Sequence, residues 1–329
     1  MHRLRRHNAT SARPGGPDAA RPPGAVIAAP DVVRSDGDAF RATDWLLFSA
    51  VSVIWGSSYL LIKIGITTLH PGVVTVGRIA LGTLALWLVR TPRATIAAGD
   101  RARLVVLSLV WVAVPFTLFP LAELHIDSAV TGMLTGATPL FGMVFGALWF
   151  GRRFGAPHLV GLAVGAAGVV MIGVGANGQG QGGTAVVGVV MTLVATVCYG
   201  YAANLAGPLQ RRYGPVTTIR WTLTLATIWT LPFGLVGLRT STFDVAAVVA
   251  LGVISTGLAF VMMAALVGGV GGARASFVAY AIPAVALVVG VTVGGEAVSA
   301  LAAGGVVLVI GGAVLAARPE RADRQQAAV

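Results

Sequence analysis

The sequence predicts an all-α membrane protein with ten transmembrane helices, arranged as two inverted five-helix repeats. Composition predicts the helical membrane class, because 56% of the residues are hydrophobic and only 11% are charged, whereas soluble domains carry roughly 25% charged residues. The mean hydropathy is +0.84. The apolar stretches between charge clusters are about 20 residues long, which is enough to cross a bilayer as helix. They do not alternate between polar and apolar residues, so a β-barrel is excluded.

An internal repeat predicts the two copies. Glycines and prolines of the first half recur 144 positions later, and Trp55 has Tyr199 as its aromatic counterpart. Since Gly and Pro determine backbone geometry, the recurrence preserves shape rather than composition. The recurring pairs are Gly56 and Gly200, Pro71 and Pro215, Pro139 and Pro283, Gly146 and Gly290, Gly151 and Gly295, Gly161 and Gly305, and Gly168 and Gly312.

The hydropathy pattern divides the chain into spans, a linker and two tails. The expected spans are 45–68, 73–90, 104–122, 128–150, 157–175, 185–206, 216–238, 245–267, 273–294 and 298–317. The uncharged Gly/Gln linker 176–184 separates a first repeat, 44–175, from a second, 185–317. The polar tails 1–43 and 318–329 flank them, and we expect the first tail to be disordered.

Basic residues predict the orientation. If the N-terminus is cytoplasmic, nineteen of the 23 basic residues fall in cytoplasmic segments, as the positive-inside rule requires. Arg239 then lies outside, while Lys63, Arg78 and Arg220 lie within spans. Both termini are expected in the cytoplasm. Five spans per copy place the second copy upside down, and such repeats exchange outward-open and inward-open forms about a central site.

The same distribution argues against a nucleic-acid partner despite the net charge of +11, because the charges lie in short clusters beside the spans. Cys198 is the only cysteine, so neither a disulfide framework nor a cysteine metal site is expected. We expect no metal and no cofactor. The expected partners are the lipid bilayer and a small-molecule substrate, and the sequence is compatible with a homodimer.

Several segments resemble EamA-domain proteins of the drug/metabolite transporter superfamily. They are Trp55-Gly56-Ser57-Ser58-Tyr59-Leu60-Leu61-Ile62-Lys63, Pro71 followed by Gly77-Arg78-Ile79-Ala80, Gly136-Ala137-Thr138-Pro139-Leu140, Ala281-Ile282-Pro283-Ala284, and Gly294-Gly295-Glu296. The first copy departs from the last motif, since Arg152 follows Gly151. The resemblance covers 44–317. It implies a ten-helix bundle in the bacterial cytoplasmic (inner) membrane that moves small metabolites or amino acids, usually outward.

Three basic residues within spans are candidate substrate-binding groups, because a charge inside a bilayer is costly. Lys63 and Arg78 lie at similar depths and are expected to attract a carboxylate or phosphate. Arg220 is the near-equivalent of Arg78 in the second copy. The alternative for Lys63 and Arg78 is snorkelling to the interface, and for Arg220 an ordinary positive-inside residue.

Polar and aromatic residues of two corresponding spans are further candidates. Trp55 and Tyr59 are four residues apart and therefore share a helix face. We expect these side chains to form cavity walls, and Ser58 and Asn204 to bind the polar part of a substrate; helix packing is the alternative. The remaining members of this group are Tyr199 and Tyr201.

Mid-span prolines and peripheral acids complete the candidates. Pro139 and Pro283 are expected to bend or open their helices and to act in gating. Glu123 and Asp127 are candidate proton or ion-pair sites, although no carboxylate occupies a span centre. The simplest interpretation is therefore facilitated transport or exchange without proton coupling.

The sequence favours a secondary transporter that exports small metabolites or amino acids by alternating access. Multidrug efflux of cationic or amphipathic compounds is the alternative within transport. An intramembrane enzyme is a distant alternative, because no His-Glu-x-x-His or Gly-x-Ser-x-Gly arrangement is present. A non-transporting membrane protein would not need paired prolines and aromatic residues at symmetric positions.

Overall fold

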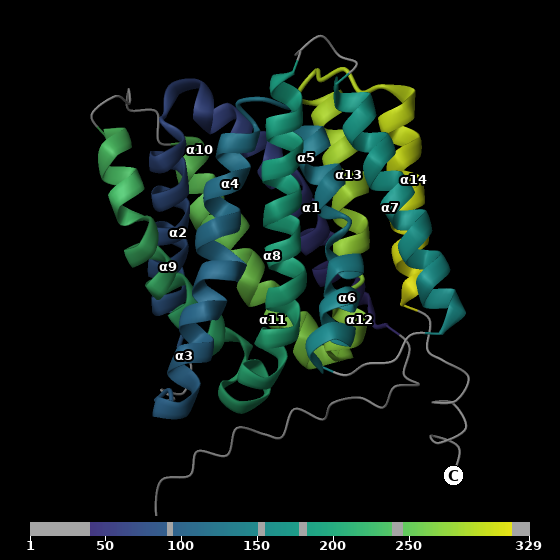
Figure 1. The fold of residues 1–329 in the computed structure, drawn as a ribbon. Coiled ribbons are helices and arrows are strands. Elements are labelled where there is room, and N and C mark those ends of the chain that lie inside the picture. The colour runs from purple at the N-terminus through teal and green to yellow at the C-terminus, as the bar shows by residue number, and fades with distance from the viewer. Residues whose placement is uncertain (1–39, 91–94, 151–154, 178–182, 239–245, 318–329) are drawn as a thin grey trace, which may run out of the picture. The chain divides into compact units, whose positions relative to one another are not determined.

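The computed structural model describes residues 40–90, 95–150, 155–177, 183–238 and 246–317, and all regular structure in these ranges is helical (Figure 1). The elements are α1 (Ala42–Thr68), α2 (Pro71–Leu88), α3 (Ala98–Leu107), η1 (Ser108–Ala113), α4 (Val114–Ala122), α5 (Ser128–Thr135), α6 (Thr138–Phe150), α7 (Ala156–Asn177), α8 (Thr184–Tyr213), α9 (Pro215–Leu238), α10 (Ala246–Val249), η2 (Ala250–Leu258), α11 (Ala259–Val270), α12 (Gly272–Ala275), α13 (Val278–Thr292) and α14 (Ala300–Ala316).

The chain is a multi-pass membrane protein. Eight helices or continuous helical runs in the described part are long and apolar enough to span a membrane, and α13 and α14 are shorter apolar helices. All ten expected spans coincide with helix, although α8 continues to Tyr213 rather than ending at 206. The expected tail 1–43, linker 176–184 and tail 318–329 lie largely outside the described residues.

Two long helical runs contain π-helix at corresponding positions. The segment η1 joins α3 to α4, and η2 joins α10 to α11. Ser108, where η1 begins, corresponds to Gly252 within η2 at the 144-residue spacing. Short π-helical stretches often mark functional sites, because the wider turn re-aims side chains. Both stretches contribute to the site described below.

The two prolines expected to bend helices differ in their surroundings. Pro139 is the second residue of α6, just after the interruption of the helix between α5 and α6. That position suits Pro, which has no N–H to donate. Pro283 lies inside α13, whose helix is continuous through it. Their role in gating stays a prediction.

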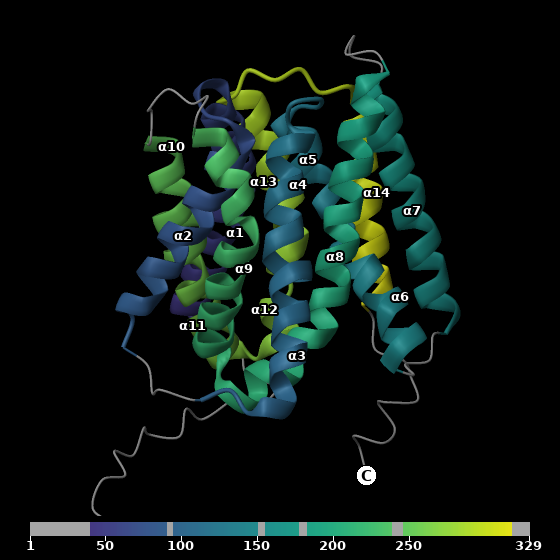
Figure 2. The same cartoon turned by 60° about the vertical axis from the view of Figure 1, so that its left-hand side comes forward.

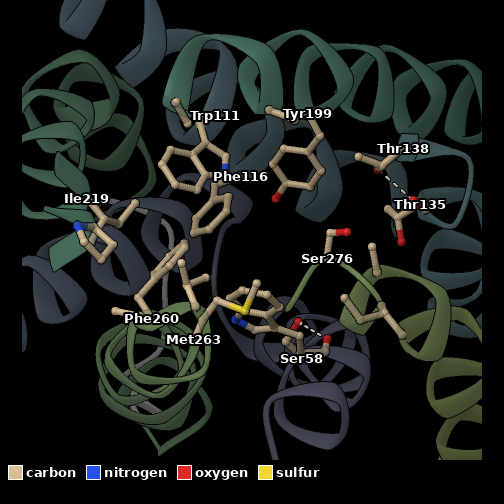
Figure 3. Close-up of a pocket in the computed structure, with 18 of the residues that line it drawn as sticks. Ser58, Trp111, Phe116, Thr135, Thr138, Tyr199, Ile219, Phe260, Met263 and Ser276 are labelled. Carbon is tan, nitrogen blue, oxygen red and sulfur yellow. Dashed lines mark hydrogen bonds between the residues drawn. The ribbon is translucent and has the colours of Figure 1, made fainter. Parts of the chain in front are cut away.

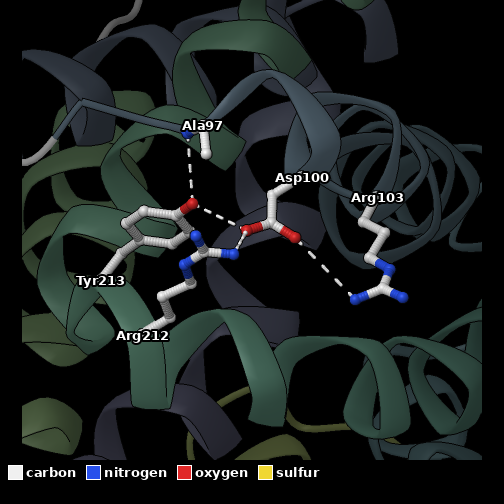
Figure 4. A network of polar contacts seen from close by, with 5 residues as sticks. All are labelled: Ala97, Asp100, Arg103, Arg212 and Tyr213. Carbon is white, nitrogen blue, oxygen red and sulfur yellow. Dashed lines mark hydrogen bonds and ion pairs between the residues drawn. The ribbon is translucent and has the colours of Figure 1, made fainter.

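The two ends of the bundle carry different charged residues, and we name them by these. The Glu123 end is where α4 ends and α5 begins; the Asp100 end is where α3 begins and α8 ends. Figures 1 and 2 show them as the upper and lower ends of the helices. At the Asp100 end, Asp100 accepts bonds from Arg212 Nη1 and the Tyr213 hydroxyl, each at 2.7 Å, so α3 is tied to α8 (Figure 4).

Helices α7 and α14 pack through reciprocal glycine contacts. A Cβ on Gly161 would lie 2.6 Å from the carbonyl oxygen of Gly312, and one on Gly168 would lie 2.6 Å from that of Gly305. Residues 161 and 168 correspond to 305 and 312 in the repeat, so each glycine meets the counterpart of the other. Two equivalent surfaces related by a two-fold axis make contacts of this reciprocal kind.

A second contact joins equivalent residues of α2 and α9. The hydroxyls of Thr83 and Thr227, which are 144 positions apart, lie within hydrogen-bonding distance at 3.2 Å. In a two-fold arrangement a residue meets its own counterpart only near the axis. The α2–α9 contact therefore lies where such an axis would pass.

The glycine contacts of α7 and α14 yield a stability prediction. Gly168→Ala should lower the free energy of unfolding by about 1–3 kcal/mol, the usual cost of overpacking, because the methyl group meets backbone atoms that cannot move aside cheaply. Gly311→Ala is the matched control, since nothing lies within 4 Å of its Cβ position. Thermal unfolding in detergent micelles measures both; equal melting temperatures for the two variants would contradict the role of Gly168.

Candidate functional site

A cavity of about 360 Å³ lies among the described helices, within the size range of small-molecule sites. It extends from the middle of α1 to the Asp100 end, where its lining includes Gln210, Pro215 and the exposed residues Gly272 and Ser276. None of the described lining residues comes from the Glu123 end. The cavity therefore opens at the Asp100 end and is closed toward the Glu123 end.

Aromatic rings form one wall of the cavity. Phe260 makes edge contacts with Trp55 and Trp111, with ring centroids 5.5 and 5.7 Å apart. The indole N–H of Trp55 donates to the carbonyl of Ser255 at 3.1 Å, which fixes this ring in place. Figure 3 shows Trp111, Phe116 and Phe260 on one side of the cavity. This wall suits the apolar body of a small molecule.

Hydroxyl groups lie on the opposite side, and aromatic residues close the cavity there. Phe119 packs against both Tyr59 and Tyr199, at centroid distances of 5.6 and 5.7 Å. The Tyr59 hydroxyl donates to Thr135 Oγ1 at 3.0 Å. The Tyr199 hydroxyl points into the cavity (Figure 3). Among the described residues it has no hydrogen-bond partner, so a ligand would meet it directly.

Arg78 is a buried cation that lines this cavity. Its side chain is 6% exposed, its Nε donates to Thr256 Oγ1 at 3.1 Å, and its Cζ lies 4.1 Å from the centroid of the Phe116 ring. In the described part of the chain, no carboxylate pairs with it and its two terminal nitrogens make no hydrogen bond. The guanidinium thus presents unused donors to the cavity.

The π-helical segment η2 positions the partner of Arg78. The Thr256 hydroxyl donates to the Leu251 carbonyl five residues earlier, the spacing of a π turn, at 2.9 Å. A Cβ on Gly82 would lie 2.5 Å from Thr256 Cγ2, so glycine is required for this close approach of α2 and η2. The wide turn and the missing side chain together bring the Thr256 hydroxyl to Arg78.

Lys63 lies outside the cavity lining and binds the end of a helix. Its Nζ donates to the backbone carbonyls of Glu123 at 2.7 Å and Ile126 at 3.3 Å. A cation at a helix C-terminus is favourable, because the last carbonyls have no partner within the helix. The geometry therefore places the Lys63 ammonium on the chain just after α4, and its role in substrate binding stays a prediction.

Two carboxylates at the Glu123 end have opposite surroundings. Glu296 accepts from the N–H groups of Ser128 and Ala129 and from the Ser128 hydroxyl, at 2.7–2.9 Å, and so caps α5. Glu123 is completely buried, and neither of its carboxyl oxygens has a hydrogen-bond partner among the residues that the structure describes. It follows the last residue of the span Ala98–Ala122. Burial raises the pKa of this carboxyl well above its ordinary value, which nearby Lys63 opposes.

Other candidate residues occupy helix contacts. Asn204 Nδ2 donates to the carbonyl of Gly142 at 2.9 Å and so joins α8 to α6. Tyr201 packs against Phe145 and Trp149. Asp127 immediately precedes α5. These three residues, like Pro139 and Pro283, are not among the described residues that line the cavity.

Arg220 also lies away from the cavity and binds a helix end. Its Nε donates to the carbonyl of Leu86 at 3.1 Å and its Nη2 to that of Val89 at 2.7 Å. Its Cζ lies 4.9 Å from the ring centroid of Trp87. The side chain thus caps α2 and borders a separate recess between α2, α3 and α9.

The cavity brings together five of the expected substrate-binding residues, namely Trp55, Ser58, Tyr59, Arg78 and Tyr199. Sequence reasoning missed Thr256 and the wall residues Trp111, Phe116, Phe119 and Phe260. One signal was available: Phe116 and Phe260 are 144 positions apart, so the repeat marks them as a pair. No local pattern marks Thr256, whose role depends on the π turn.

The chain belongs to the EamA-like transporter family, whose profile matches residues 44–174 and 186–318. It is 26% identical over 295 residues to a protein of Streptantibioticus cattleyicolor named "Probable terminal-alkyne amino-acid exporter", covering 86% of this chain and 96% of that protein. It is 23% identical over 249 residues to a protein of Archaeoglobus fulgidus named "Uncharacterized transporter", covering 75% and 88%. A solved crystal structure, 20% identical, matches with a TM-score of 0.55 over 84% of this chain and 96% of that one, which supports the fold.

The surroundings of Lys63 predict a structural effect. Lys63→Met should lower the free energy of unfolding by about 1–3 kcal/mol, because the carbonyls of Glu123 and Ile126 lose a half-buried donor. Ligand binding in the cavity should be unchanged. Thermal unfolding and flux measurements together test this, with the exposed Arg211→Met as control. Unaltered stability combined with lost flux would instead assign Lys63 to the substrate.

Proposed function

We propose that this protein is a secondary transporter that exports small carboxylate-bearing metabolites, amino acids among them, across the cytoplasmic membrane by alternating access. The observation that carries the proposal is the position of Arg78, a buried guanidinium that faces an aromatic cavity and has no carboxylate partner in the described part of the chain. Such a residue inside a membrane protein needs a compensating interaction. A carboxylate that binds in the cavity supplies one.

The chemistry of the cavity supports a substrate with two unlike parts. A guanidinium offers a rigid fork of N–H donors that matches a carboxylate, and Arg78 is held by Thr256 and Phe116 with its terminal nitrogens unused. The Trp55, Trp111 and Phe260 wall suits an apolar side chain. An apolar amino acid or a similar organic acid combines both parts. The relative named an amino-acid exporter is consistent with this substrate class.

Alternating access rests on a proposed inverted repeat of ten helices with both termini cytoplasmic. The reciprocal glycine contacts of α7 and α14, the Thr83–Thr227 contact and the matching π-helical segments all support it. The distribution of basic residues supports a cytoplasmic location of the Asp100 end. The described state is then inward-open, because its cavity reaches that end.

The arrangement argues against the efflux of cationic drugs. The described residues that line the cavity include a guanidinium and no carboxylate. A cationic ligand would therefore meet a like charge in a site of low dielectric constant, which is unfavourable. A neutral or anionic amphipathic compound would not meet this repulsion. Substrates are therefore excluded by their positive charge and not by their size.

Uptake into proteoliposomes tests the function. Purified protein is reconstituted and assayed with a panel of amino acids, organic acids and cationic dyes, with and without a pH gradient. We expect saturable flux of carboxylate-bearing compounds. Absence of flux for every compound would overturn the transport proposal, and flux of the dyes alone would replace it with multidrug efflux.

Variants of Arg78 test the site itself. Arg78→Ala should reduce carboxylate flux by about tenfold or more, because a hydrogen bond to a charged group contributes ~1.5–3 kcal/mol. Arg78→Lys should retain part of the flux, since the positive charge remains but the paired N–H donors that bind both oxygens of a carboxylate are lost. Arg211→Ala, an exposed basic residue of α8, is the matched control. Wild-type flux in Arg78→Ala would remove Arg78 from the site.

A further inference from the structure

The carboxyl group of Glu123 is unusual among the polar groups of the described chain. Glu123 is completely buried. Among the described residues, its two carboxyl oxygens are the only solvent-inaccessible side-chain polar atoms without a hydrogen-bond partner. An ionised carboxylate in such a place loses its hydration without compensation, whereas the neutral acid loses much less. The geometry of this state therefore favours a bound proton on Glu123.

Charged and titratable groups face Glu123 from the neighbouring segments, and they oppose one another. Lys63 of α1 and Arg78 of α2 favour the ionised form, while Glu296 and Asp127 favour the neutral form. Tyr59 also interacts with it. Lys63 does not neutralise the carboxylate by an ion pair, because its Nζ binds the Glu123 backbone carbonyl instead. Burial is the largest of these influences, and it favours the neutral acid.

The repeat shows where Glu123 would lie in the opposite state. Its counterpart 144 positions later is Val267, which lines the cavity near the Asp100 end. Other residues of this mouth have counterparts at the Glu123 end: Pro215, Gly272 and Ser276 correspond to the buried residues Pro71, Ser128 and Gly132, and Gln210 corresponds to the half-buried Ile66. If the copies exchange conformations, Glu123 takes the cavity-facing position that Val267 has here.

We propose that Glu123 is a proton-binding site that couples the pH of the outer solution to the conformational equilibrium of the transporter. This inference rests on the proposed alternating access. When the Glu123 end opens, water reaches the carboxyl and its proton leaves to the outer solution. When that end closes, a proton from the same solution binds the carboxylate. Acid pH thus favours the state open at the Asp100 end, and neutral to alkaline pH favours the opposite state.

The test measures the two states without any substrate. Single-cysteine reporters are placed at Gln210→Cys and at its counterpart Ile66→Cys, each in a Cys198→Ala background, and the labelling rate by a maleimide is measured in proteoliposomes at pH 6 and pH 8. We expect the ratio of Gln210→Cys to Ile66→Cys labelling to be about fivefold higher at pH 6, a typical coupling between linked sites. In Glu123→Gln, which mimics the neutral acid, the ratio should stay high at both pH values.

Controls separate this effect from reagent chemistry and misfolding. The pH dependence of the maleimide reaction is common to both reporters, so it cancels in the ratio. Asp127→Asn is the matched control, because Asn remains a good residue before a helix, and it should keep the pH response. A pH-independent ratio in the otherwise unsubstituted reporters, or an unchanged pH response in Glu123→Gln, would overturn the proposal.

A stability measurement provides a second, independent test. In the described state, whose Glu123 end is closed, Glu123 holds its proton more tightly than in the unfolded chain. The stabilising effect of this proton is therefore present at acid pH and is lost as the pH rises. The melting temperature of the wild type should therefore fall relative to Glu123→Gln between pH 5 and pH 8. Parallel profiles would contradict proton binding at Glu123. Neither test needs flux, so a failure of the transport assay leaves both decisive.

Discussion

Within a bilayer a polar group must find its partner in the protein, and the ends of helices supply most of these partners here. Lys63 binds carbonyls just beyond α4 and Arg220 binds those at the end of α2, while Glu296 accepts from the first N–H groups of α5. The charge of each side chain is opposite to the partial charge of the helix end that it contacts. Among the buried charged side chains of the described residues, Arg78 and Glu123 are the two that bind neither a helix end nor a side chain of opposite charge, and the proposed substrate and proton sites follow from this difference.

The proposed inverted repeat explains both what the copies share and where they differ. Shared positions are glycines, prolines and the threonine pair Thr83 and Thr227, which permit close contact of backbones and helices. The unpaired charges occur in one copy only: Arg78 corresponds to Thr222, and Glu123 to Val267. In the proposed alternating access, symmetry describes the movement of the bundle, whereas the asymmetric residues are the proposed binding and regulatory groups.

The cavity combines a rigid apolar wall with a cation held by a π turn. Gly82 and Thr256 allow α2 and η2 to approach closely enough for Thr256 to hold Arg78. On the opposite side, the aromatic cluster of Tyr59, Phe119 and Tyr199 lies between the cavity and the Glu123 end. In the proposed alternating access, opening of that end separates these aromatic rings and exposes Glu123.

The sequence by itself determined the helical membrane class, the positions of the helices and the family, because hydropathy and Gly/Pro spacing are local properties of the chain. It also identified Arg78 and Glu123 as candidates, since a charge in or beside an apolar span is visible in one dimension. Only the tertiary structure distinguished Arg78 from Lys63 and Arg220, because a cation's role depends on whether a helix end or a cavity lies beside it. The contact of Thr256 with Arg78 and the lack of a described partner for the Glu123 carboxyl could likewise be recognised only in the structure. Contacts between distant helices leave no pattern in the sequence of either helix.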